Sequence, residues 1–382
     1  MKKILIVMDS MRIGGIQQSL VNFLNCIDYD KYNVDLFLFN NDLNYEINKN
    51  VNIIYSNWLL NTVSTSSADA RKNGIIKYIT RMIFSLFAKI FGAPITFKFL
   101  FMFEKKLNGY DACISFSNNV NDKSIYFGCN KFVLEKVEAK QKISWLHTDY
   151  NVIKSKYNSN EYKKFDKIIA VSKFGANTLA ANVPEVSKKI TVIKNMIDDE
   201  EINEKSKQFK VDFDKANFNI VCVGRLDINK NQIEQLKIIK KLNENGLKHI
   251  KLYLIGDGPE RKNLEKYIKE NNLTNVIITG YVSNALPYLK KSDLCISTSL
   301  VESYSMALLE SLILNVPTIV LRNDACEEII NNQFMIANTP DELYKKIKSV
   351  VEDKKTYEKL KQMSTFTNEN EKNLKKFYNI LN

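Results

Sequence analysis

Two glutamates eight positions apart, Glu302 and Glu310, are the residues best placed to do chemistry in this chain. A predicted strand leads into the loop that holds Glu302, and Glu310 lies about one turn inside the predicted helix that follows. The amides at the start of that helix would favour a phosphate, because helix N-termini attract anions. They belong to Ser305, Met306 and Ala307. A carboxylate on each side of this anion site predicts hydrogen bonds to the hydroxyls of a sugar and of a ribose.

A second candidate group consists of two cations in residues 224–232, which follow another predicted strand. Arg225 lies at the carboxyl end of that strand, where open α/β sheets bind ligands. Lys230 follows five residues later. A guanidinium supplies a planar fork and an ammonium a mobile point charge, so together they are suited to neutralise a diphosphate. Alone, the same pair would be two surface cations.

Three glycine turns mark further strand ends. Gly14-Gly15 follows the first predicted strand and opens a helix, where a close turn lets backbone amides approach a phosphate or a sugar. The strings GDGP at 256–259 and TGYV at 279–282 end two later strands, and turn chemistry alone explains them as well as ligand contact does. Because the chain contains no GxGxxG string, a dinucleotide-dependent dehydrogenase lacks its main sequence support.

The elements that must position these residues are short apolar strands alternating with helices. Such strands are typical of parallel sheets covered on both faces, and two consecutive sets predict an α/β fold with two doubly wound domains. We place the boundary in the polar stretch 195–217. The predicted strands are 3–8, 33–39, 51–55, 111–115, 142–146, 167–171 and 189–193, then 218–223, 250–255, 275–279, 293–297, 318–321 and 333–336.

Residues 71–106 break this rhythm with a basic, amphipathic segment. Apolar side chains from Ile75 to Ile90 recur at helical spacing, and Lys77, Arg81 and Lys89 recur on the other side. The segment holds eight Lys or Arg and one Glu. One interpretation is a helix pair that packs in the core with a solvated back. The other is a helix lying in the interface of an anionic membrane, which the near absence of acids favours.

Composition limits the remaining classes. The 382 residues are 45% hydrophobic and 26% charged, as in an ordinary globular protein, and no apolar run is long enough to span a membrane. The net charge is +12, and almost all of the excess falls in residues 1–195, which points to an anionic partner for that half. Six scattered cysteines predict buried thiols in a reducing compartment, and two histidines make a zinc site improbable.

Taken in order, the motifs resemble the retaining nucleotide-sugar glycosyltransferases of family 4, and the resemblance runs from the first strand to the final helix. This resemblance extends to three further strings, WLHTDY (145–150), VSKF (171–174) and VIKNMID (192–198). The string WLHTDY particularly resembles enzymes of bacterial capsule, exopolysaccharide and O-antigen assembly. The resemblance implies a GT-B fold of two Rossmann-like domains facing across a cleft. Residues 1–195 would bind the acceptor, 196–365 the nucleotide sugar, and 366–382 would form a C-terminal helix that packs back on the N-terminal domain.

The resemblance also implies residue roles. Arg225 and Lys230 would hold the donor diphosphate, Glu310 the ribose, and Glu302 would face the donor sugar. The other implied donor contacts are Tyr281 and Val282 at the base, the amides 305–307, Gly15, and His147 reaching the sugar from the N-terminal domain. Four positions depart from the family pattern and leave the sugar and acceptor contacts open: Gln17, Met196, Ser303 and Ser305.

A catalytic metal is not expected. The other common transferase fold holds a metal with a DxD pair, but Asp28-Tyr29-Asp30 and Asp212-Phe213-Asp214 fall in a polar turn and in the linker. Arg225, Lys230 and a helix dipole supply the positive charge instead. We therefore expect no cofactor and no metal.

The predicted function is retaining transfer of a sugar from a nucleotide donor, with UDP-sugars favoured, to a glycan or lipid-linked acceptor. The predicted location is cytoplasmic, at the inner face of an anionic membrane. The alternative is a non-enzymatic protein that binds nucleic acid or membrane through its basic charge. That alternative does not explain the strand-end motifs, and no nucleic-acid module is recognisable, so no nucleic acid partner is expected.

Overall fold

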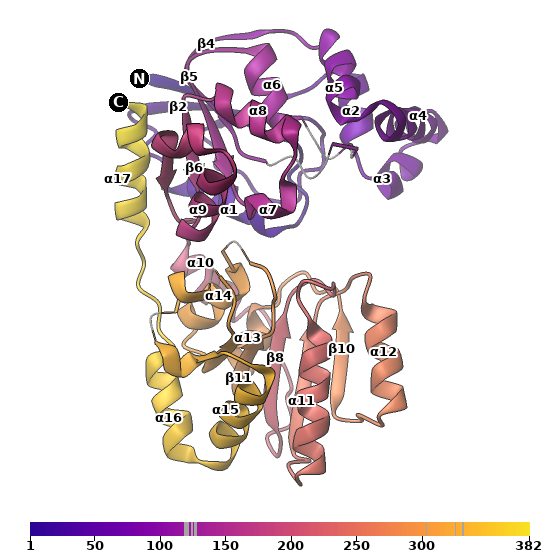
Figure 1. The fold of residues 1–382 in the computed structure, drawn as a ribbon, viewed down its shortest axis with the longest axis vertical. Coiled ribbons are helices and arrows are strands. Elements are labelled where there is room, and N and C mark those ends of the chain that lie inside the picture. The colour runs from indigo at the N-terminus through magenta and orange to yellow at the C-terminus, as the bar shows by residue number, and fades with distance from the viewer. Residues whose placement is uncertain (118–121, 124, 126–127, 303, 325, 331) are drawn as a thin grey trace. The chain divides into compact units, whose positions relative to one another are not determined.

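The computed structural model describes residues 1–117, 122–123, 125, 128–302, 304–324, 326–330 and 332–382. The chain divides into two compact units, each with its own parallel sheet (Figure 1). Unit 1 consists of Met1–Ile197 and Glu369–Asn382, and unit 2 consists of Asp198–Asn368. The last helix therefore belongs to the same unit as the first strand.

Unit 1 is built on a seven-stranded parallel sheet in the order β3-β2-β1-β4-β5-β6-β7. The second halves of its inner strands are buried, because helices cover both faces of the sheet. The strands are β1 Lys2–Met8, β2 Tyr32–Leu38, β3 Val51–Tyr55, β4 Leu107–Ser115, β5 Val137–Leu146, β6 Lys167–Ala170 and β7 Ile190–Val192. The helices are α1 Gly15–Cys26, α2 Trp58–Ser64, α3 Ser67–Lys72, α4 Ile75–Phe91, α5 Ala93–Met102, α6 Cys129–Lys136, α7 Tyr150–Ile153, α8 Lys156–Lys164, α9 Lys173–Asn182, the 3₁₀ turn Pro184–Lys189 and α17 Asn370–Leu381.

The C-terminal helix α17 packs against α1 and the start of β2. The ring of Phe377 lies edge-on to Phe23 at 4.8 Å, and Tyr378 stacks on Tyr32 at the same centroid distance. Phe377 is fully buried. Burial of such an aromatic side chain removes a large apolar area from water, so α17 is part of the core of unit 1.

Unit 2 has a six-stranded parallel sheet in the order β10-β9-β8-β11-β12-β13, the strand order of a Rossmann fold. The strands are β8 Phe218–Val223, β9 Ile250–Ile255, β10 Val276–Gly280, β11 Leu294–Ser297, β12 Thr318–Leu321 and β13 Ile336–Ala337. The helices are α10 Asp199–Lys205, α11 Gln232–Glu244, α12 Arg261–Glu270, α13 Leu286–Lys291, α14 Met306–Ile313, α15 Pro340–Glu352 and α16 Lys354–Met363, with 3₁₀ turns at Cys326–Glu328 and Gln333–Met335.

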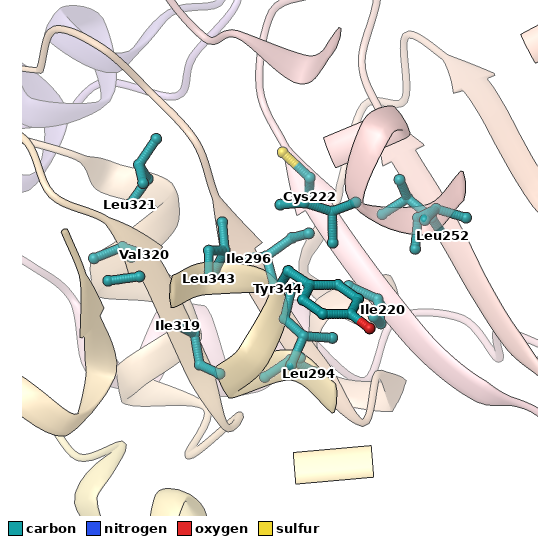
Figure 2. Close-up of a cluster of buried hydrophobic side chains, with 14 of the residues drawn as sticks. Ile220, Cys222, Leu252, Leu294, Ile296, Ile319, Val320, Leu321, Leu343 and Tyr344 are labelled. Carbon is teal, nitrogen blue, oxygen red and sulfur yellow. The ribbon is translucent and has the colours of Figure 1, made fainter. Parts of the chain in front are cut away.

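The core cluster of unit 2 lies between its central strands and the helices that pack on them. Figure 2 shows Ile220 and Cys222 of β8 and Leu294 and Ile296 of β11 in the same cluster as Tyr344 of α15. Because the central residues of β8 and the first three residues of β11 are buried, these strands hold the loops that follow them in fixed positions.

Two details of the predicted elements are wrong. The strand predicted at 333–336 survives only at Ile336, since Gln333–Met335 is a 3₁₀ turn. The side chain of Asn332 accepts the N–H of Phe334 at 2.9 Å and turns the backbone there. In addition, β4 and β5 begin at Leu107 and Val137, earlier than their apolar runs indicate.

Helix α4 is amphipathic as predicted, but the predicted basic stripe is partly wrong. Arg81 is buried, and its Nε donates to the carbonyl of Thr65 at 2.5 Å. Lys77 is half-buried and Lys89 is exposed. The apolar side chains instead face outward. They are Ile75, Ile76, Ile79, Met82, Ile83, Leu86 and Ile90, each at least half exposed.

The six cysteines, all among the described residues, are thiols and not disulfides. Five are buried, as predicted, and Cys26 is half-buried. Burial raises the pKa of the Cys222 and Cys326 thiols, so both stay protonated at neutral pH.

Candidate active site

The strand order of unit 2 creates a crevice between β8 and β11. These strands are neighbours, yet the chain continues from β8 to β9 on one side and from β11 to β12 on the other. At such a switch point the two following loops diverge and leave a ligand site at the carboxyl ends. The loops are residues 224–231, which hold Arg225 and Lys230, and residues 298–302, which end at Glu302.

Hydrogen bonds join these two loops. Leu300 donates its N–H to the carbonyl of Asn229 at 2.7 Å. The hydroxyl of Thr298 donates to the carbonyl of Asn231 at 2.9 Å and accepts from the buried Gln235. A buried hydroxyl with both functions satisfied is costly to displace, so the loops are held at a defined separation.

The GDGP turn supports the first loop from behind. Leu226 donates its N–H to the carbonyl of Asp257 at 3.0 Å. A Cβ at Gly256 would lie 2.0 Å from the carbonyl oxygen of Gly224, and one at Gly258 would lie 2.2 Å from that of Leu226. Only glycine allows this approach. Close packing therefore accounts for these glycines.

The central feature of the site is an ion pair between Lys230 and Glu302. Their side chains are 29% and 13% exposed, so the pair is partly withdrawn from water. Both residues line one small pocket together with Ser305 and Ala307 at the start of α14. A cation, a carboxylate and a helix N-terminus thus meet where the sequence predicted an anion and a sugar.

Arg225 stands at the exposed end of the same loop. Its side chain is 71% exposed, and its Nε lies 3.9 Å from a carboxylate oxygen of Asp227. A hydrogen bond fixes the backbone at Arg225, since the side-chain amide of the buried Gln232 donates to the Arg225 carbonyl at 2.9 Å. Gln232 also lines the pocket and was not predicted as a site residue. The sequence signal that indicates Gln232 is its position in the first turn of α11, directly after the loop that holds Arg225 and Lys230.

Glu310 lies on α14, half-buried. Burial raises the pKa of this carboxyl to about 7, and the nearby Lys205 only partly offsets the effect. Tyr281 is exposed and Val282 half-buried after β10, two strands from β8. These three residues are not among the described residues that line the pocket of Lys230 and Glu302. Ser303 lies outside the described residues.

The remaining predicted site residues belong to unit 1. His147 is buried and packs its ring on Phe116 at 4.5 Å. Burial lowers the pKa of His147 to about 3, so the imidazole is neutral at physiological pH. Gly15 is the exposed first residue of α1, next to the switch point between β1 and β4. Met196, where the family pattern has glycine, is buried, and its carbonyl accepts from Asn22 at 2.9 Å.

Asp9 is a candidate residue that is not among those predicted from the sequence motifs. It follows β1 at the same switch point, and burial raises the pKa of its carboxyl against the lowering effects of Ser117 and Arg12. Its place between the first strand and Gly14 was the signal that marked it. A carboxyl held in this way is suited to a hydrogen bond with a ligand hydroxyl.

One aspartate of each DxD pair is engaged elsewhere. Asp28 forms an ion pair with Lys31 at 2.7 Å, and Asp214 accepts from the side-chain amide of Asn217. Among the described residues, no group of three or more His, Cys, Asp or Glu side chains is arranged to hold a metal ion.

Comparison with known proteins identifies the unit that holds this site. Residues 203–365 match the family model described as Glycosyl transferases group 1. This part of the chain is a group 1 glycosyltransferase domain. The protein is therefore a glycosyltransferase, and the resemblance of its motifs to glycosyltransferases is confirmed. The non-enzymatic alternative is not supported.

One characterised relative is similar along most of the chain. It is the N-acetylgalactosamine-N,N'-diacetylbacillosaminyl-diphospho-undecaprenol 4-alpha-N-acetylgalactosaminyltransferase of Campylobacter jejuni, 26% identical over 320 residues. The match covers 82% of this chain and 78% of that protein.

Solved structures confirm the GT-B fold predicted from the sequence. Anabaena HepE in complex with UDP and glucose aligns with a TM-score of 0.63 at 16% identity, over 95% of this chain and 94% of HepE. A variant of S. aureus TarM in complex with UDP aligns over 100% of both chains, with a TM-score of 0.67 and 12% identity. In the described part of this glycosyltransferase, every helix is too short or too polar to cross a bilayer.

Proposed function

We propose that this glycosyltransferase is a hexosyltransferase-type enzyme that moves a sugar from a UDP-sugar to a lipid-linked glycan with retention of configuration at the transferred carbon. The observation that supports the donor site is the meeting of Lys230, Glu302 and the start of α14 at the carboxyl ends of β8 and β11. Solved relatives in complex with UDP support the choice of nucleotide.

In this proposal the donor diphosphate replaces Glu302 as the ion-pair partner of the Lys230 ammonium group. Lys230 turns toward the phosphate oxygens, Arg225 approaches from the exposed side, and the amides at the start of α14 donate to the same anion. Glu302 is then available to accept a hydrogen bond from a hydroxyl of the donor sugar. Glu310 accepts from the ribose, and Tyr281 with Val282 borders the base.

The reaction step needs no carboxylate nucleophile and no metal in this scheme. The acceptor oxygen attacks the anomeric carbon on the face that the diphosphate leaves, one C–O bond forms and the C–O bond to the diphosphate breaks. The proton of the acceptor hydroxyl passes to the leaving phosphate oxygen. Lys230, Arg225 and the helix dipole stabilise the charge that develops on that phosphate.

The acceptor is a sugar chain on a lipid diphosphate, as the name of the Campylobacter relative supports. Residues 1–195 would bind it, with Asp9 near Gly15 as a hydrogen-bond partner for its hydroxyl and His147 as a neutral side chain on the donor sugar. The reaction would take place at the inner face of the membrane, in the assembly of a surface polysaccharide.

A donor panel tests this function. Purified protein is mixed with each of several UDP-sugars, with GDP- and ADP-sugars as controls, and with a glycosylated polyprenyl diphosphate. We expect UDP release and an enlarged lipid-linked product from at least one UDP-sugar. Failure of every UDP-sugar, or transfer only to soluble glycans, would contradict the proposal. The anomeric configuration of the product, determined by NMR, separates retention from inversion.

A further inference from the structure

Apolar side chains are exposed on two helices of unit 1 more than anywhere else in the described part of the chain. Half of its exposed large apolar residues fall between positions 75 and 103. Eight lie on α4, and α5 adds Ile95, Phe99 and Met102. Figure 1 shows α4 at the outer edge of unit 1. We call these exposed apolar residues of α4 and α5 the α4–α5 face.

This face is not the inner side of a helix pair that packs in the core. The opposite side of α4 holds the buried Ala88 and Arg81, and it packs on α2 and α3. Arg81 is tied to the carbonyl of Thr65, at the end of α2. Because the protein-facing side is already occupied, turning α4 to bury its apolar face would break a buried hydrogen bond.

The exposed charges between residues 71 and 106 are all positive. Six cations between residues 71 and 106 are exposed: Arg71, Lys72, Lys89, Lys98, Lys105 and Lys106. The one acid in that range, Glu104, is half-buried and accepts the N–H of Asn57 at 3.0 Å. A second copy of the chain on this face would bring like charges together, so the charge pattern disfavours self-association.

We propose that the α4–α5 face attaches the protein to an anionic lipid bilayer. Apolar side chains spaced three or four apart enter the acyl boundary, and the lysines at their edges meet lipid phosphates. Lys89 follows Leu86 by three residues, so its stem can extend along the face while its ammonium reaches the headgroups. Trp58 is exposed near this face, since the side-chain amide of its neighbour Asn57 donates to the carbonyl of Phe103. Tryptophan is enriched at membrane interfaces.

The primary test is co-sedimentation of the full chain with vesicles. We expect binding to phosphatidylglycerol-rich vesicles at least tenfold stronger than to phosphatidylcholine vesicles, weakening as salt rises. Ile79→Glu/Ile83→Glu should abolish binding, and Val152→Glu, an exposed apolar residue of α7, is the control that should retain it.

Charge is tested by a matched pair of double variants. Lys89→Glu/Lys98→Glu should weaken binding to the anionic vesicles by roughly tenfold or more, since each basic residue near the surface contributes about a factor of five. Lys164→Glu/Lys188→Glu makes the same change of net charge on exposed residues outside the face and should have a much smaller effect. Circular dichroism establishes that each variant is folded.

Insertion depth gives an independent measurement. An Ile83→Trp variant should show a blue-shifted emission on anionic vesicles and quenching by lipids brominated on the acyl chain, whereas Val152→Trp should show neither. Equal binding of all variants, no binding by wild type at low salt, or a dimer in sedimentation velocity that Ile79→Glu dissociates would overturn the proposal. Vesicle binding needs no substrate, so its failure would leave the proposed sugar transfer standing.

Discussion

The ammonium group of Lys230 and the carboxylate of Glu302 form an ion pair between the loops that follow β8 and β11. The two residues are 72 positions apart, and only the strand order of unit 2 brings them together. Both side chains are partly buried, so water screens their attraction less and the ion pair fixes both of them. A diphosphate would compete with Glu302 for Lys230, which couples binding of the anion to release of the carboxylate for the sugar.

Substitution of Glu302 and of Glu310 should affect UDP binding differently. Glu310→Gln should weaken UDP binding by roughly tenfold, because an amide accepts less strongly than a carboxylate from ribose hydroxyls. Glu302→Gln should leave UDP affinity equal or slightly higher, since it frees Lys230, while it lowers sugar transfer. Calorimetry with UDP on both variants measures the difference, and an equal loss of affinity would refute the assignment.

Glu310 should link stability to pH. Burial raises the pKa of its carboxyl to about 7 in the folded protein, well above the ordinary value of 4.5. The unfolded chain therefore ionises first, and stability falls as pH rises from about 4.5 to 7. Glu310→Gln removes that penalty and should stabilise the protein at pH 8 by up to about 3 kcal/mol, with little effect near pH 4.

Urea unfolding at both pH values measures this change. A variant that is more stable at pH 8 and yet binds UDP more weakly would show that the carboxylate is kept for the ligand. For wild type, UDP should bind more tightly as pH rises from 6 to 8, and the variant should lose that dependence. A flat wild-type profile over this range would argue against ribose recognition by Glu310.

Activity should not depend on a divalent metal. The positive charge needed at the leaving diphosphate comes from Arg225, Lys230 and the start of α14 in the proposed scheme. Transfer measured with and without excess EDTA should therefore agree within error. A loss that manganese or magnesium restores would reopen the role of the Asp28 and Asp212 pairs.

Arg81 and Lys89 should contribute differently to the free energy of unfolding, although both are cations on α4. Arg81 is buried and donates to the Thr65 carbonyl, so Arg81→Ala should lower the free energy of unfolding by about 1–3 kcal/mol. Lys89 is exposed, and Lys89→Ala should stay within about 0.5 kcal/mol of wild type. Equal stability of the two variants would mean that the Arg81 hydrogen bond contributes little.

The positions of the site loops could be predicted because continuous apolar strands are unambiguous. Val221-Cys222 and Cys295-Ile296 are fully or nearly buried, and Gly224 and Glu302 come after them at predictable places. The pairing of Lys230 with Glu302 could not be predicted, since it depends on which strands are neighbours. The raised pKa of Glu310 likewise depends on three-dimensional burial.

Helix α4 shows a second limit of pattern-based prediction. Periodicity establishes that Ile79 and Ile83 share a face, but it does not say whether protein covers that face. The sequence pattern is compatible with both possibilities and groups Arg81 with the surface lysines. The structure turns the apolar face outward and buries Arg81, because α2 offers the Thr65 carbonyl on the inner side.

The most direct test of the donor site is turnover by two variants of the 224–231 loop and a matched control. Lys230→Ala and Arg225→Ala should each lower UDP release from the preferred UDP-sugar by roughly 10²-fold or more at saturating donor. Lys237→Ala removes an exposed lysine from the same region, on α11, and should keep near-wild-type turnover. Retention of wild-type turnover by Lys230→Ala, or an equal loss in Lys237→Ala, would contradict the proposed site.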